Sequence, residues 1–157
     1  MILTLHNVAT ELLNDEAIQV RYVYSNITPK FWVLTKDIDI ELSTGQYITI
    51  PAGFTTDFCT VPKLLWGLFP PFGDFLLASI IHDYLYVARP YTSRALADRE
   101  MLLWSQALNG DRAYDKAVRY WWKRFDNHLR YWCVRAFGWS YWQHVFKFST
   151  RKKIAYE

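Results

Sequence analysis

The feature that most restricts the fold of this chain is a run of mostly apolar residues, 75–81, that leads directly into the polar pair His82-Asp83. Residues 75–89 have the length of a helix, and a proline ends it. A helix this apolar is expected to be buried, and burying an unpaired polar or charged side chain costs several kcal/mol. The pair must therefore find its partners elsewhere in the chain.

The first third of the chain has the pattern of β-strands. Apolar and polar residues alternate over most of 17–24 and again over 31–42, as in strands with one buried face. A turn containing glycine at 43–45 leads to a third segment of this kind, 46–50. In the second segment the residues predicted to face the core are Ile38, Ile40 and Leu42. Together these segments predict an antiparallel β meander.

A long loop and a helical hairpin are predicted next. Residues 51–74 contain four prolines and predict the loop, and loops of this length are often functional. After the helix at 75–89, Thr92 or Ser93 can cap a second helix that ends near residue 108.

A third helix is predicted over 111–137, with Gly138 as its expected cap. Strands that come before helices predict an α+β fold. The expected order is an N-terminal antiparallel β meander, a helical hairpin and C-terminal helices.

These elements fit one domain over residues 1–157. Its expected parts are a β-rich part (1–50), a loop (51–74), a helical part (75–148) and a basic tail (149–157). The apolar fraction of 52% is that of a globular protein. No apolar run reaches the roughly 18 residues of a membrane span, so we expect no transmembrane segment.

The helical hairpin brings polar residues to the same height. His82 lies about 10 Å before the turn and Asp98 about 8 Å after it, because a helix rises 1.5 Å per residue. In antiparallel helices the two side chains can face each other. Tyr86 lies one turn after His82 on the same face, and Asp83 points toward the loop that carries Asp57.

Three interpretations of these residues are open. Asp57, His82, Asp83 and Asp98 form a suitable ligand set for a divalent cation that accepts oxygen and imidazole ligands. His82 can instead be a catalytic general base whose tautomer is fixed by Asp98. In the third interpretation the His–Asp pair only ties two helices together, and Asp57 accepts hydrogen bonds from loop amides.

The C-terminal part of the chain is basic and aromatic. Residues 119–157 hold nine of the 18 Lys and Arg residues but only two of the 15 Asp and Glu residues. Trp and Tyr residues lie among Arg and Lys over 119–148, and aromatic and Arg side chains dominate interface hot spots. We predict that 119–148 binds a partner, a protein rather than a nucleic acid, and that the chain belongs to an oligomeric assembly.

Four motifs resemble those of DUF1353, an uncharacterised family of small tailed-phage and prophage proteins. They are Ile50-Pro51-Ala52-Gly53-Phe54, Thr56-Asp57-Phe58-Cys59-Thr60-Val61-Pro62, His82-Asp83-Tyr84-Leu85-Tyr86 and Ala97-Asp98-Arg99. The resemblance covers roughly residues 31–110. Cys59-Thr60 replaces the family's Ala-Ser, which argues against a role for a serine hydroxyl there.

The resemblance implies a tailed-phage protein that is made in the host cytoplasm and carried in the virion. We expect a tail, neck or envelope-penetration component whose partners are other virion proteins. The alternative is a metal-assisted hydrolase, lipase-like or peptidase-like, that uses His82 with Asp57, Asp83 or Asp98. The spacing of these residues is also similar to that in secreted phospholipases. Their Gly-rich calcium loop and disulfides are missing here, so this likeness concerns the site and not kinship.

Overall fold

A computed structural model describes residues 2–7, 18–23, 31–56, 75–88, 93–110, 124–139 and 142 of the chain. The strands are β1 (Ile2–Leu3), β2 (Val20–Val23), β3 (Phe31–Leu34), β4 (Ile38–Glu41), β5 (Tyr47–Ile50) and β6 (Thr55–Thr56). The helices are α2 (Leu76–Ala88), α3 (Arg94–Gly110) and a C-terminal helix over 124–139. This combination of strands and helices confirms the α+β class.

The strands form two small sheets instead of one meander. One sheet has the order β1-β4-β5 and the other the order β2-β3-β6. Pairing is antiparallel between β2 and β3, β3 and β6, and β4 and β5. β1 pairs with β4 in parallel, with Ile2 opposite Asp39. The predicted antiparallel meander is therefore present only in part.

The predicted strand over 31–42 consists of two strands, β3 and β4, that belong to different sheets. The chain bends between them, where the Leu34 N–H donates to the Phe54 carbonyl and the Thr35 N–H to the Gln19 carbonyl. Leu34 and Ile38 are both buried, but Lys36 between them is exposed, so the alternation of apolar and polar residues is interrupted at the bend. The polar residues 35–37 are therefore a sequence signal for the break, which the prediction of one segment over 31–42 did not use.

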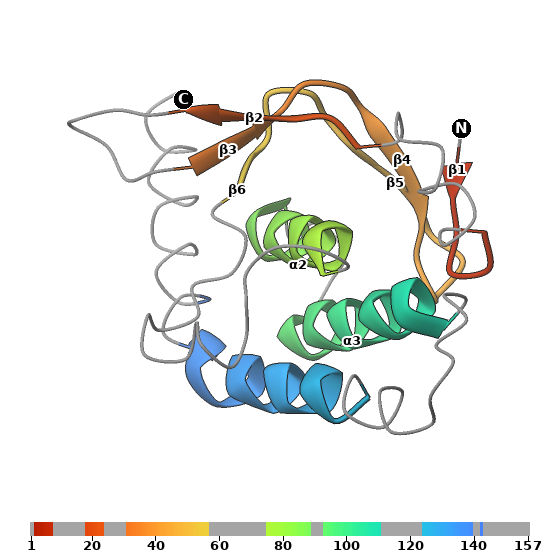
Figure 1. The fold of residues 1–157 in the computed structure, drawn as a ribbon, viewed down its shortest axis with the longest axis vertical. Coiled ribbons are helices and arrows are strands. Elements are labelled where there is room, and N and C mark those ends of the chain that lie inside the picture. The colour runs from red at the N-terminus through yellow and green to blue at the C-terminus, as the bar shows by residue number, and fades with distance from the viewer. Residues whose placement is uncertain are drawn as a thin grey trace.

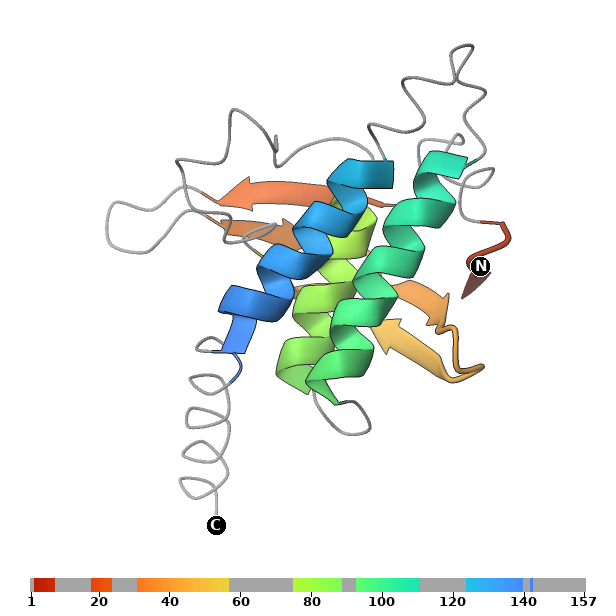
Figure 2. The same ribbon diagram turned by 90° about the horizontal axis from the view of Figure 1, so that it is seen from below.

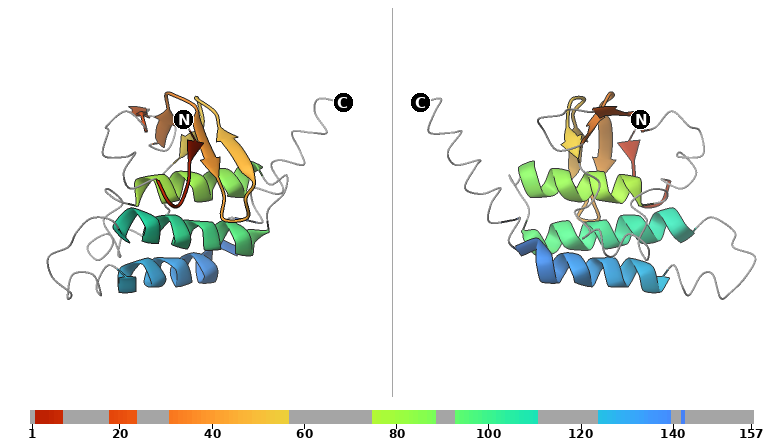
Figure 3. Two further views of the ribbon diagram at one scale, coloured as in Figure 1. Left: turned by 90° about the vertical axis from the view of Figure 1, so that its right-hand side faces the viewer. Right: turned by 60° about the vertical axis from the view of Figure 1, so that its left-hand side comes forward.

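The helices lie on one side of the strands (Figure 1). α2 is next to the sheets, and α3 and the C-terminal helix follow below it (Figure 3). Seen from below, α3 and the C-terminal helix flank α2 and form the outer helical layer (Figure 2). None of the helices in the described ranges is long and apolar enough to cross a membrane.

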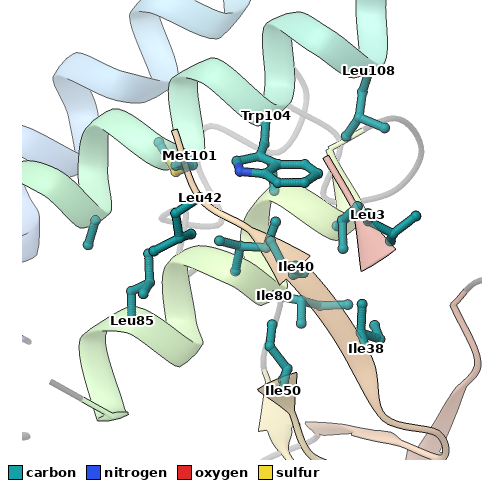
Figure 4. Close-up of a cluster of buried hydrophobic side chains, with 14 of the residues drawn as sticks. Leu3, Ile38, Ile40, Leu42, Ile50, Ile80, Leu85, Met101, Trp104 and Leu108 are labelled. Atoms are coloured by element: carbon teal, nitrogen blue, oxygen red, sulfur yellow. The ribbon is translucent and has the colours of Figure 1, made fainter. Parts of the chain in front are cut away.

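The hydrophobic core lies between the β1-β4-β5 sheet and the helices α2 and α3 (Figure 4). Ile38, Ile40 and Leu42 are 3%, 0% and 2% exposed, so their predicted inward orientation is confirmed. The helices contribute further buried side chains, including Ile80, Leu85, Met101, Trp104 and Leu108. Burial of each such side chain contributes about 1.5–3 kcal/mol and fixes the helices against the sheet.

Two predicted boundary residues have the expected geometry. The Ser93 hydroxyl accepts a hydrogen bond from the Leu96 N–H at 3.2 Å, so Ser93 is the N-cap of α3. Gly45 has φ +79° in the turn between β4 and β5, a conformation that L side chains rarely adopt.

Two other boundaries differ from the prediction. Thr55–Thr56, expected in the loop, form β6 and pair with β3. The C-terminal helix continues to residue 139 and so passes through Gly138, which is not its cap. The rest of the predicted loop, 57–74, and the predicted helical residues 111–123 lie outside the described residues.

Candidate functional site

The centre of the candidate site is the contact between α2 and α3. His82 and Tyr86 are one turn apart on α2, with ring centroids 4.1 Å from each other. Asp98 projects from α3 between them. Its Oδ1 accepts hydrogen bonds from His82 Nε2 at 3.0 Å and from the Tyr86 hydroxyl at 2.5 Å. The structure thus brings together His82 and Asp98, which the sequence placed at similar height, and Tyr86, which it placed one turn further on the face of His82.

The second oxygen of Asp98 is bound by arginines. Arg135 Nη1, from the C-terminal helix, donates to Asp98 Oδ2 at 2.9 Å. Arg94 Nε, one turn before Asp98 on α3, lies 3.6 Å from the same oxygen. Arg94 also donates through Nη2 to the backbone carbonyls of Val134 and Arg135, so it joins α3 to the C-terminal helix. The fully buried Asp98 therefore has charge-assisted partners on both oxygens.

The other side of the His82 ring faces Asp83. His82 Nδ1 lies 3.6 Å from Asp83 Oδ1, and the two side chains are 11% and 18% exposed. Asp83 Oδ2 accepts a hydrogen bond from the Thr56 hydroxyl of β6 at 2.5 Å. A chain of polar contacts thus runs from the β2-β3-β6 sheet through α2 to α3 and the C-terminal helix.

Carboxylates on both sides of His82 affect the pKa of its imidazole. Burial by itself would lower the pKa of His82, but the neighbouring carboxylates Asp83 and Asp98 outweigh it and raise that pKa. Burial by itself would raise the pKa of Asp98, but the hydrogen bonds from His82, Tyr86 and Arg135 hold it below its usual range. Burial, together with the bond to Asp98, raises the pKa of the Tyr86 hydroxyl, which stays a donor.

Four residues around this centre were not among the predicted site residues: Thr56, Arg94, Arg135 and Gly138. The sequence did indicate an ion pair between Arg94 and Asp98, because residues four apart on a helix are neighbours. It gave no such indication for Arg135, since its place in the basic, aromatic segment indicates a partner-binding surface instead. A Cβ atom at Gly138 would lie 2.9 Å from the Tyr86 hydroxyl oxygen, so this position needs a glycine to let the C-terminal helix approach α2.

The described residues support the predicted metal site less well than they support the hydrogen-bonded contact of His82 with Asp98. No group of three or more His, Cys, Asp or Glu side chains in the described ranges is arranged to hold a metal ion. Both oxygens of Asp98 are already bound by His82, Tyr86 and Arg135, which makes Asp98 a poor ligand. Asp83 Oδ1 is 3.6 Å from His82 Nδ1, so this oxygen is less tightly held. Asp57, the remaining predicted ligand, lies outside the described residues.

The predicted partner-binding segment contains both inward and outward side chains. Arg130 is 6% exposed, pairs with Asp126 at 3.1 Å and lies over the Phe75 ring. Trp142 packs on Tyr86, with ring centroids 4.9 Å apart. Trp139, in contrast, is 57% exposed. Some basic and aromatic side chains of 119–148 therefore make contacts within the protein.

Comparison with models of protein families matches residues 32–122 to the family described as a protein of unknown function, DUF1353. The matched segment contains His82, Asp83, Tyr86 and Asp98, whereas Arg135 lies beyond it. Comparisons with curated proteins and with solved structures give no significant match. Because the family model covers more than half of the sequence, this chain is a member of the DUF1353 family.

Proposed function

We propose that this protein is a hydrolase of carboxylic esters or amides whose general base is His82. The observation that supports this best is the orientation of the imidazole. Asp98 holds Nε2, so Nδ1 is on the other side of the ring, near Asp83, whose side chain is 18% exposed. The 3.6 Å between Nδ1 and Asp83 Oδ1 is too long for a direct hydrogen bond, so Nδ1 is not fixed to that carboxylate. A base that activates water needs one held nitrogen and one accessible nitrogen.

In this proposal Nδ1 takes a proton from water as the water oxygen attacks the carbonyl carbon. The bond from that carbon to the leaving oxygen or nitrogen then breaks, and the imidazolium returns the proton to the leaving group. Asp98 stabilises the imidazolium between these two steps, while Tyr86 and Arg135 hold Asp98 in position. General acid–base catalysis of this kind contributes typically about 10²–10⁴-fold in rate.

A metal-assisted form of this reaction would use Asp83 as a ligand, with Asp57 as the second predicted ligand. Asp57 follows Thr56, which already contacts Asp83. A divalent cation supplies Lewis acidity at the carbonyl oxygen.

The proposed setting is a tailed-phage particle, in which the protein is a tail, neck or envelope-penetration component. The resemblance to phage proteins supports this setting, as do the exposed aromatic side chains of the C-terminal helix. Mass spectrometry of purified particles tests it directly. The chain should be present at constant stoichiometry after extensive washing, and its absence from particles would contradict a virion role.

The proposed hydrolytic activity is tested with the His82→Gln variant and a matched control, His128→Gln. His128 is a half-buried histidine of the C-terminal helix that contacts Gln106, away from Asp98. Both variants and the wild type are assayed on nitrophenyl esters, a peptide anilide and phospholipid vesicles, with EDTA and with added Ca²⁺ or Mg²⁺. We expect His82→Gln to lower kcat about 10²–10⁴-fold and His128→Gln to leave it unchanged.

The same variants separate catalysis from a purely structural pair. If the wild type hydrolyses none of these substrates, and His82→Gln only lowers the melting temperature, the pair ties the helices together and the hydrolase proposal is wrong. Activity that disappears with EDTA and returns with one cation supports the metal-assisted form.

A further inference from the structure

Arg94 lies between α3 and the C-terminal helix, and its hydrogen bonds go to the backbone of that helix. Arg94 Nη2 donates to the carbonyl of Val134 at 3.3 Å and to the carbonyl of Arg135. Arg135 is also the residue whose side chain donates to Asp98 Oδ2, at 2.9 Å. Arg94 thus holds the backbone of the residue that binds the buried carboxylate.

The direct contact of Arg94 with Asp98 is weaker. Arg94 Nε lies 3.6 Å from Asp98 Oδ2, beyond hydrogen-bond distance, and has no hydrogen-bond partner among the described residues. The Arg94 side chain is only 17% exposed, so its position is not explained by contact with solvent. Arg94 therefore contributes less as a partner of Asp98 than as a donor to the helix that carries Arg135.

The contact between Arg135 and Asp98 depends on where that helix lies. A displacement of roughly 1 Å is enough to take a donor out of hydrogen-bond distance of Oδ2. The Arg135 side chain is long and 34% exposed, so other rotamers are open to it. Holding the backbone at 134 and 135 favours the rotamer that reaches the carboxylate.

We propose that Arg94 is a positioning residue of the His82 site and that it acts through Arg135. It fixes the place from which Arg135 binds Asp98, and Asp98 in turn holds His82 Nε2 at 3.0 Å. The position of the C-terminal helix is thereby transmitted to the histidine. The catalytic consequence rests on the proposed hydrolytic role of His82, whereas the coupling between the helix and the histidine does not.

A double-mutant cycle read at the His82 imidazole tests this coupling. Arg94→Met and Arg135→Met keep long side chains but remove the donors and the charge. The two single variants, the double variant and the wild type are compared by NMR with isotope-labelled histidine. The Nε2 resonance of His82 reports its hydrogen bond to Asp98 and is assigned by its absence from His82→Gln. All spectra are recorded at one pH and at a temperature at which melting curves show every variant folded.

We expect Arg94→Met and Arg135→Met to shift this resonance in the same direction. The double variant should shift it no further than Arg135→Met alone, because Arg94 then has nothing left to position. If Arg94 acted on Asp98 by its own charge, the two shifts would add. Additive shifts, or an Arg94→Met resonance at the wild-type position, would overturn the proposal.

Arg130→Met is the matched control. Arg130 is a buried arginine of the same helix that pairs with Asp126. Its replacement should lower the melting temperature and leave the His82 resonance in place. A shift as large as that of Arg94→Met would show that any weakening of the helix moves the resonance, and the specific role of Arg94 would be wrong.

Hydrolysis gives a separate measurement. Arg94 and Arg135 touch no substrate in the proposed reaction, so both single variants should lower kcat by up to about 10²-fold with little change in KM. An active wild type with an unchanged kcat in Arg94→Met would contradict the role of Arg94 in the reaction. If the wild type hydrolyses nothing, the proposed function is wrong, and the resonances still decide whether Arg94 positions Arg135.

Discussion

Two buried carboxylates on α3, Asp98 and Glu100, are two residues apart and both 0% exposed, yet their partners differ in kind. Glu100 accepts hydrogen bonds from neutral donors, the Ser43 backbone N–H at 3.2 Å, the Ser43 hydroxyl and the Trp104 indole N–H at 3.1 Å. Asp98 is bound by ionisable groups, namely His82, Tyr86, Arg94 and Arg135.

The difference separates a structural acid from a candidate functional one. Glu100 fastens the β4–β5 turn to α3 through neutral groups. Asp98 holds a histidine whose second nitrogen lies 3.6 Å from Asp83, a carboxylate that is 18% exposed. Burial of an acid is therefore not the signal of a site in this protein. The signal is an ionisable partner that extends the charge network to solvent.

The largest expected difference between the two acids is in stability. Asp98→Asn leaves the buried His82 and two arginines without their anion, so we expect unfolding to become easier by about 3–5 kcal/mol. Glu100→Gln keeps an acceptor for neutral donors and should lower stability by about 1–2 kcal/mol. Urea denaturation of both variants measures this. Equal losses would remove the distinction between the two acids.

A second effect concerns how closely the C-terminal helix approaches the Asp98 centre. Gly138→Ala would push on the Tyr86 hydroxyl that donates to Asp98, and we expect a loss of about 1–3 kcal/mol despite the better helix propensity of alanine. In a Tyr86→Phe background the clashing oxygen is absent, so Gly138→Ala should have a smaller effect there. The same loss in both backgrounds would show that the contact with the hydroxyl is not the cause.

The stability of the protein should depend on pH through His82, the histidine bound to Asp98. Because the pKa of His82 is raised on folding, its stabilisation is complete below the pKa of an unfolded histidine, about 6.5, and is lost as the pH rises through the raised value. The slope is at most about 1.4 kcal/mol per pH unit. Hydrolytic activity should rise over the same range, since a general base must be deprotonated.

Denaturation at a series of pH values above about 6 checks this slope. It should be present in the wild type and in Glu100→Gln but absent in His82→Gln. A slope that remains in His82→Gln would assign the titration to another group.

The smallest expected effect is at Glu100, the buried acid whose hydrogen-bond donors are neutral. Ser43→Ala removes one hydroxyl donor to Glu100 but keeps the backbone N–H, so we expect a loss of about 1 kcal/mol with no change in activity. Thermal melting and the ester assay measure the two quantities. A loss of activity comparable to that of His82→Gln would mean that Glu100 belongs to the functional centre.

The sequence by itself determined the features that depend on local spacing. Helical rise placed His82 and Asp98 at similar height, and helical periodicity placed Tyr86 on the face of His82. The alternation of apolar residues identified Ile38, Ile40 and Leu42 as core. Ser93 was one of two residues predicted as the cap, together with Thr92, because a capping hydroxyl accepts a hydrogen bond from only three residues ahead. Each of these inferences uses geometry that is nearly the same in all helices and strands.

Only the tertiary structure decided which distant groups complete the centre. Arg135 reaches Asp98 across 37 residues of sequence, and Thr56 reaches Asp83 across 27. The division of 31–42 between two sheets was missed as well. The exposed residues 35–37 interrupt the alternation, but they do not reveal that β3 and β4 join different sheets. Such contacts depend on how helices and sheets meet, and no periodicity within one segment contains that information. The sequence pattern of an amphipathic helix is the same whether a charged residue faces solvent or a buried carboxylate. Arg135 faces the buried carboxylate of Asp98.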